Sequence, residues 1–97
     1  MIPERAYNIA ATYGPNNETR IIACQEPGTA YFYAIYIDKC PKDETRKGAS
    51  KKAIWANAYA RDVDKGFHQE TWDAVKGTKY EEEYKNFFKQ AEKDKII

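Results

Sequence analysis

The expected fold follows from AYFYAIYID, the segment that spans residues 30–38. Tyrosine, phenylalanine and isoleucine favour pleated surfaces, and apolar residues stand at both the odd and the even positions of this segment. A strand that is apolar on both faces is typical of the middle of a sheet, or of a strand that is covered on both sides. We therefore predict a strand at 30–38 as the central element of the fold.

Two more strands are predicted on the N-terminal side of this segment. Residues 6–13 alternate with the period of a half-buried strand, and residues 19–26 form a second strand. The segments between the strands, 14–17 and 26–29, are rich in Gly, Pro and Asn, which are the usual residues of tight turns. The three strands are expected to form an antiparallel meander.

The second half of the chain has the period of helices. Residues 51–64 place alanines on one stripe, with Ser50 as a candidate N-cap, and a shorter helix is expected at 68–76. Residues 42–50 are polar and fit either a loop or a frayed helical turn. Beyond them, Thr78 and Glu81 have the spacing of a capping box. The apolar stripe that follows consists of Tyr80, Tyr84, Phe87, Phe88 and Ala91.

These elements predict an α+β fold, in which two or three helices pack on one face of a three-stranded antiparallel meander. A length of 97 residues suits a single domain, 1–97. We identify no internal repeat, linker or low-complexity segment.

Composition favours a folded protein, and two cysteines without a signal peptide predict reduced thiols in the cytoplasm. The chain is 42% hydrophobic and 32% charged, which is too apolar for disorder, and it contains no leucine. A net charge of +1 exerts no strong pull on nucleic acid or on an anionic membrane. No apolar run approaches the ~20 residues that span a bilayer, and residues 1–5 do not begin a signal peptide. We expect no membrane contact.

The residues able to carry chemistry are few. His68 is the only histidine, and Cys24 and Cys40 are the only thiols. Neither cysteine has a local context that would lower its thiol pKa, and no metal-ligand spacing or phosphate-binding glycine loop is present. We expect no metal and no cofactor. An enzyme that uses a cysteine with His68 is one alternative, and a protein without catalytic activity is the preferred interpretation.

Tyrosines supply the candidate binding site. If the helices cover one face of the sheet, the other face is open, and tyrosine is a common residue of binding hot spots. We place Phe32, Ala34 and Tyr36 under the helices, because alanine allows close packing. The predicted partner-binding residues on the open face are Tyr31, Tyr33, Tyr7 and Tyr13.

The leading functional hypothesis is a small non-enzymatic binding protein that occludes a macromolecular partner, with a protein preferred as that partner, as phage or mobile-element inhibitors do. The alternative is nucleic-acid binding through the strand tyrosines and a basic patch. That patch comprises Lys42, Arg46, Lys47, Lys51 and Lys52. Because Asp43 and Glu44 offset part of its charge, any such affinity is expected to be weak and sensitive to salt.

Overall fold

The computed structural model describes the backbone of residues 1–96 and the side chains of residues 1–88, and every regular element in that part of the chain is a helix. The predicted α+β class and its three-stranded meander are therefore wrong. The elements are α1 (Pro3–Tyr13), α2 (Asn17–Ala23), α3 (Pro27–Phe32), η1 (Tyr33–Asp38), α4 (Asp43–Ala49), α5 (Ala53–Tyr59), η2 (Ala60–Asp64), α6 (Gln69–Val75) and α7 (Glu81–Ile96).

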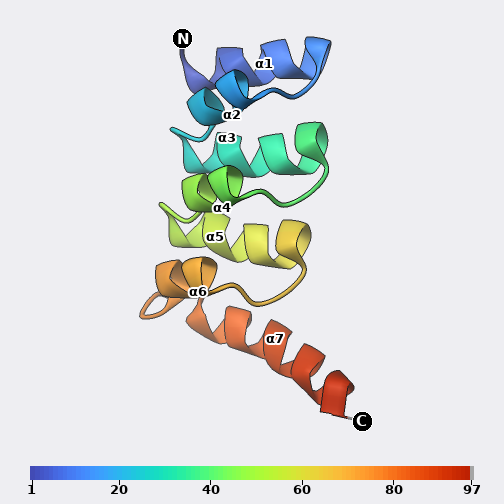
Figure 1. Cartoon of the computed structure of the whole chain (residues 1–97). Coiled ribbons are helices and arrows are strands. Elements are labelled where there is room, and N and C mark those ends of the chain that lie inside the picture. The colour runs from blue at the N-terminus through green and yellow to red at the C-terminus, as the bar shows by residue number, and fades with distance from the viewer. Residues whose placement is uncertain (97) are drawn as a thin grey trace.

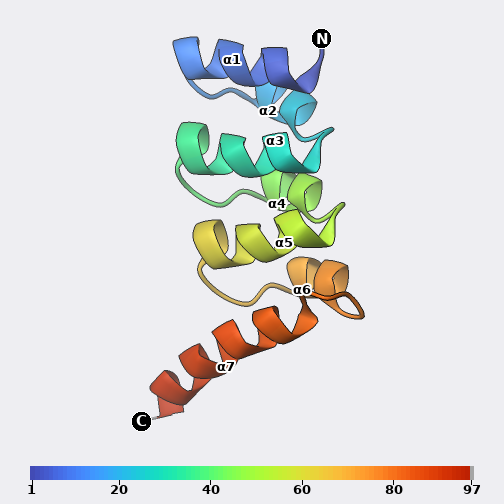
Figure 2. The same cartoon turned by 180° about the vertical axis from the view of Figure 1, so that it is seen from behind.

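The helices are stacked in chain order along one axis. The longer helices α1, α3 with η1, and α5 with η2 lie one after another, and the short helices α2, α4 and α6 run beside them (Figure 1). Here η1 and η2 are π-helical turns that continue α3 and α5. The view from behind shows the same layers, with α7 at the C-terminal end (Figure 2). The Cα extents of 44 × 27 × 15 Å describe an elongated stack of helix pairs.

A 26-residue repeat underlies this stack. The pattern Glu-Thr-Arg at 18–20 returns at 44–46, and as Glu-Thr-Trp at 70–72. Lys39 and Lys65 also lie 26 residues apart, and both adopt left-handed backbone conformations with φ of 57° and 53°. The earlier conclusion that the chain has no internal repeat is wrong. Each repeat is one helix pair, which buries its apolar side against its neighbours as solenoid repeats do.

Residues 30–38 form a helix because their small and aromatic residues also fit the helical period. Ala30, Tyr33, Ala34 and Ile37 stand at i, i+3, i+4 and i+7, and the first three are completely buried. Pro27 lies in the first turn of α3, where a missing N–H is harmless, and not in a β-turn. This helical face, and not a pleated one, decides which side chains enter the core.

The C-terminal predictions agree better with the structure. Helices were expected at 51–64, at 68–76 and after Thr78, and α5 with η2, α6 and α7 occupy these positions. Residues 42–50 contain the further helix α4. Ser50 is the C-cap of α4, however, and Lys52 is the N-cap of α5. Of the predicted apolar stripe on the last helix, Ala91 lies outside the described side chains.

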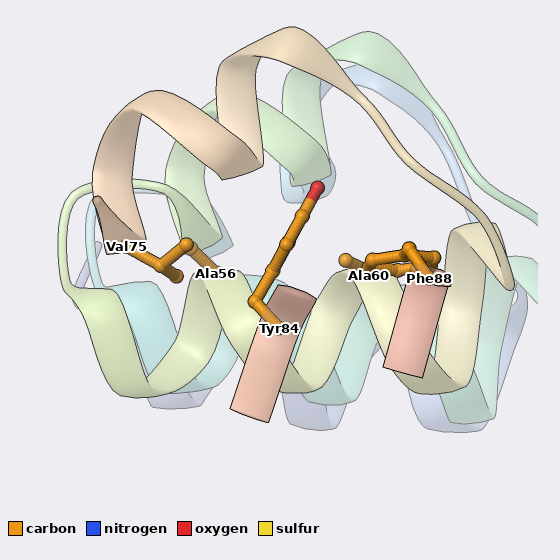
Figure 3. Close-up of a cluster of buried hydrophobic side chains, with 5 residues drawn as sticks. All are labelled: Ala56, Ala60, Val75, Tyr84 and Phe88. Atoms are coloured by element: carbon orange, nitrogen blue, oxygen red, sulfur yellow. The ribbon is translucent and has the colours of Figure 1, made fainter. Parts of the chain in front are cut away.

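The core is built from aromatic rings packed against alanines, and these residues take the place that leucine has in most cores. In the cluster between α5, α6 and α7, Val75 lies beside Ala56 and Phe88 beside Ala60, with Tyr84 between these two pairs (Figure 3). Alanine lets neighbouring helices approach closely, and the large ring fills the remaining space. Two similar clusters surround Tyr33 and Tyr59.

The same polar contact joins successive helix pairs. Tyr33, Tyr59 and Tyr84 are buried, and their hydroxyls lie 2.8, 2.7 and 2.8 Å from the hydroxyls of Thr19, Thr45 and Thr71. Each tyrosine comes from the long helix that follows, and each threonine from the short helix before it. Because the threonines recur at the repeat spacing, this contact holds each long helix in the same position relative to the short helix before it.

Candidate partner-binding face

The four predicted partner-binding tyrosines do not share a surface. The open sheet face on which they were placed does not exist, and Tyr33 is completely buried. Tyr13 is 84% exposed at the end of α1, whereas Tyr7 and Tyr31 are half-buried. Tyr33 is thus part of the scaffold, and only the other three are open to a partner.

An aromatic patch forms around the residues that were expected to lie under the helices. Phe32 and Tyr36 are 40% and 61% exposed and stack with ring centroids 6.0 Å apart. Tyr31 lies edge-on to Phe32 at 5.2 Å, and Trp55 lies edge-on to the same ring at 5.6 Å. We call these four residues, Tyr31, Phe32, Tyr36 and Trp55, the aromatic patch.

Two hollows flank Phe32. The first, about 290 Å³, lies between α1 and α3 and is lined by Glu4, Tyr7, Asn8, Thr29 and Phe32. The second, about 390 Å³, lies between α3 and α5 and is lined by Glu26, Pro27, Gly28, Thr29, Phe32, Lys52 and Trp55. Because Thr29 and Phe32 belong to both, the hollows form one continuous surface across three long helices.

A glycine allows the second hollow to take its shape. A Cβ atom on Gly28 would lie 3.0 Å from two atoms of the Trp55 ring, which is closer than ordinary van der Waals contact. Trp55 therefore packs against the bare backbone at the start of α3. This contact holds the indole in place beside Phe32, so that the ring position is set before any ligand arrives.

The repeat supplies an internal comparison for the aromatic patch. The position of Phe32 is occupied by Ala6 in the preceding repeat and by Ala58 in the following one, and the position of Trp55 is occupied by Thr29. The same helix pair therefore forms with small residues at these places. In contrast, the scaffold tyrosines and threonines recur. Phe32 and Trp55 are therefore large rings at positions where a neighbouring repeat has a small residue, although Trp55 also packs against the buried cluster around Tyr59.

Tyr31 connects the aromatic patch to η2 through a hydrogen bond. Its hydroxyl donates a hydrogen bond of 2.6 Å to the carboxylate of Asp62 in η2. Burial, followed by this hydrogen bond, raises the pKa of Tyr31 to about 12. Hydrogen bonds from Arg61 and Tyr31 lower the pKa of Asp62. The hydroxyl of Tyr31 is therefore neutral and fixed in direction at neutral pH.

The predicted basic patch loses its arginine in the structure. Arg46 is buried and donates hydrogen bonds to Asp64 and Asp43. Lys51 donates a 3.1 Å hydrogen bond to the backbone carbonyl of Cys24. Lys42, Lys47 and Lys52 remain, and Lys52 belongs to the second hollow. Of the five residues proposed to bind nucleic acid, Arg46 is therefore buried and paired, and the four lysines keep their charges.

The candidate cysteine–histidine chemistry has no structural support within the described residues. Cys24 caps the end of α2 and is buried, and burial raises its thiol pKa to about 11. Cys40 is exposed in the loop before α4, and His68 is an exposed N-cap of α6. None of the three makes a side-chain hydrogen bond to another in this part of the chain. A buried thiol with a raised pKa is a poor nucleophile.

Two further properties follow from the described residues. They contain no group of three or more His, Cys, Asp or Glu side chains arranged to hold a metal ion. No helix among them combines the length and the apolar character needed to cross a bilayer.

Sequence reasoning missed Phe32, Tyr36 and Trp55 as surface residues, although two signals for them were present. The helical period of 30–37 leaves Phe32 and Tyr36 outside the buried face. Aligning the repeats would have shown that Phe32 and Trp55 replace small residues. Both signals depend on reading the segment as a helix, which the strand assignment prevented.

These observations define an α-helical repeat protein with an aromatic, doubly hollowed face on its long helices. Comparison with protein families gives no match, and neither a curated protein nor a solved structure matches the chain. Any proposal about its function therefore rests on the chemistry of its own surface.

Proposed function

We propose that this chain is a non-enzymatic binding protein, which recognises a protein partner through the aromatic patch and the two hollows beside it. The observation that carries the proposal is the exposure of Phe32 and Tyr36 next to Trp55, since a neighbouring repeat has a small residue at the positions of Phe32 and Trp55. Partly exposed aromatic rings in a cluster are typical of binding hot spots, because they offer a large rigid surface at low entropic cost.

The architecture supports this function. Stacked helix pairs form an extended surface to which each repeat contributes one long helix, and repeat proteins commonly bind their partners on such surfaces. Of the tyrosines first suggested as contacts, Tyr7 lines the first hollow and Tyr31 belongs to the aromatic patch. A partner that covers both hollows would have its own contact surface buried against this face. That surface would then be closed to other molecules.

A pair of substitutions taken from the repeat itself tests the proposal. Phe32→Ala installs the residue of both neighbouring repeats, and Trp55→Thr that of the preceding one. We expect the double variant to remain helical and to lose the partners that cross-link to the wild type in a lysate of the source cells. Each ring should contribute about 2 kcal/mol or more to binding.

Tyr13→Ala is the matched control, since Tyr13 is an exposed aromatic that lines neither hollow. Partners identified by mass spectrometry should be retained by this variant. If the double variant keeps the same cross-linked partners as the wild type, the aromatic patch is not the binding site.

A further inference from the structure

We propose that the segment bound by this face is a peptide that presents an arginine side chain to the first hollow. This inference rests on the proposed function and specifies the partner's chemistry. Its basis is the combination, in one hollow, of two aromatic rings with a carboxylate that has no ion-pair partner among the described side chains.

The first hollow is acidic. Its only charged lining residue is Glu4, which is exposed and forms no salt bridge among the described side chains. The remaining lining residues, Tyr7, Asn8, Thr29 and Phe32, are uncharged. A carboxylate at the edge of an otherwise uncharged hollow favours a cationic ligand group and disfavours a phosphate or a carboxylate.

The aromatic rings favour arginine over lysine. A guanidinium is planar, stacks on aromatic faces and donates two parallel hydrogen bonds to a carboxylate. Phe32 supplies a partly exposed ring and Tyr7 a second ring on the opposite helix, while Glu4 supplies the carboxylate. The same stacking already occurs inside this protein, where the guanidinium of Arg20 lies 5.6 Å from the ring centre of Tyr33.

Tyr7 differs from the scaffold tyrosines in the hydrogen bonding of its hydroxyl. It occupies the repeat position of Tyr33 and Tyr59, whose hydroxyls bind threonines of the preceding helix pair. Among the described residues Tyr7 has no such threonine and makes no side-chain hydrogen bond. Among the described residues, Tyr7 thus lines the first hollow with no scaffold hydrogen bond from its hydroxyl.

The second hollow places a limit on the ligand. It carries both Glu26 and Lys52, and the hydroxyl of Thr29 donates a hydrogen bond of 3.1 Å to Glu26. Its charges balance, so it suits an uncharged side chain packed against Trp55. Neighbouring helices lie about 9 Å apart, which a peptide in the polyproline II conformation spans in one turn of about three residues, so that side chains three positions apart lie on the same side. The bound segment should therefore carry arginine at one position and an apolar residue three positions away.

The probe is a blocked hexapeptide, acetyl-Gly-Arg-Ala-Ala-Leu-Gly-amide, titrated into the full ¹⁵N-labelled chain and followed by NMR chemical shifts. Replacing its arginine with citrulline gives an uncharged ligand of nearly the same shape. We expect the arginine peptide to shift the amide signals of α1, α3 and α5, and the citrulline peptide to bind about tenfold more weakly, because a charge-assisted hydrogen bond is lost.

Protein variants complete the test. Glu4→Gln should remove the preference for arginine over citrulline, whereas Glu18→Gln, an exposed glutamate outside both hollows, should leave it unchanged. Equal binding of the two peptides to the wild type, or shifts confined to other helices, would overturn the inference. In that case, partners that still depend on Phe32 and Trp55 in the cross-linking experiment would leave the proposed function standing.

Discussion

The guanidinium of Arg46 in α4 donates two hydrogen bonds to the carboxylate of Asp64 at the end of η2, one of 2.9 Å from Nε and one of 2.6 Å from Nη2. Arg20 and Asp38, one repeat earlier, make the same pair of bonds at 2.8 and 2.6 Å. Both pairs are buried. They join the short helix of one pair to the long helix of the next, so they contribute to the packing between successive repeats.

Removing one partner of this pair should be costly. In Arg46→Met the Asp64 carboxylate, which is only 6% exposed, loses its counter-charge, and the free energy of unfolding should fall by about 3 to 5 kcal/mol. Replacing both partners, as in Arg46→Met with Asp64→Leu, should restore much of that loss. Urea unfolding followed by circular dichroism measures the difference. A double variant no more stable than Arg46→Met would show that the buried charge is not the cause.

The tyrosine–threonine contact predicts a second stability effect. In Tyr59→Phe, the backbone N–H of Lys42 loses its 3.1 Å acceptor and Thr45 loses its 2.7 Å partner. Leaving such groups unpaired should destabilise the protein by about 1 to 3 kcal/mol. Tyr33→Phe, its equivalent in the preceding repeat, should cost a similar amount. Tyr36→Phe serves as the control, since Tyr36 is 61% exposed, and its effect should stay under about 0.5 kcal/mol.

Gly48 marks the closest approach of α4 to the helices before it. A Cβ atom there would lie 2.8 Å from the Cβ of Ala30 and 2.9 Å from the backbone oxygen of Cys24. Helix propensity alone would favour alanine by about 1 kcal/mol, but overpacking typically costs about 1 to 3 kcal/mol. We expect Gly48→Ala to lower the melting temperature. Gly66→Ala, which meets no atom closer than 3.9 Å, should not show this loss.

The two thiols should react at very different rates. Cys40 is exposed, whereas Cys24 is buried, and burial raises the pKa of Cys24 to about 11. Because the thiolate is the reactive form, a thiol reagent should label Cys40 quickly in the native protein and Cys24 only after unfolding. Mass spectrometry of Cys40→Ser, which keeps Cys24 alone, checks this. Rapid labelling of that variant under native conditions would contradict the buried position of Cys24.

Alkaline titration should detect the hydrogen bond between Tyr31 and Asp62. The pKa of Tyr31 is raised to about 12, first by burial and then by this bond, from an ordinary value of about 10. The folded chain then holds a proton that the unfolded chain releases. The resulting stability is fully present below about pH 10 and is lost as the pH rises towards 12.

Absorbance of tyrosinate in wild type and Tyr31→Phe isolates this group, since burial also raises the pKa of Tyr59. Asp62→Asn removes the nearby negative charge and should lower the pKa of Tyr31. An unchanged titration in Asp62→Asn would show that burial alone sets the value.

Local signals in the sequence determined the C-terminal helices. The predicted capping box, in which Thr78 and Glu81 each accept a hydrogen bond from the other's backbone N–H, is wrong, because α7 begins at Glu81. Thr78 instead accepts a hydrogen bond from the N–H of Tyr80, and Glu81 accepts one from that of Gly77. The same two side chains still mark the start of the helix. Such contacts need no distant partner. The recurrence of Thr19, Thr45 and Thr71 was likewise present in the sequence, and it encodes the stacked helix pairs.

Only the tertiary structure decided the state of residues 30–38 and the side of that segment that is exposed. Alternating aromatic residues fit a strand as well as a helix when a segment is this short. Packing against α1, α2 and α4 favours the helix, because it buries Tyr33 with its hydroxyl on Thr19 and places Ala30 and Ala34 where helices meet. Phe32 is left outside by the same packing. The candidate binding face therefore depends on contacts between residues far apart in the chain, which no local pattern contains.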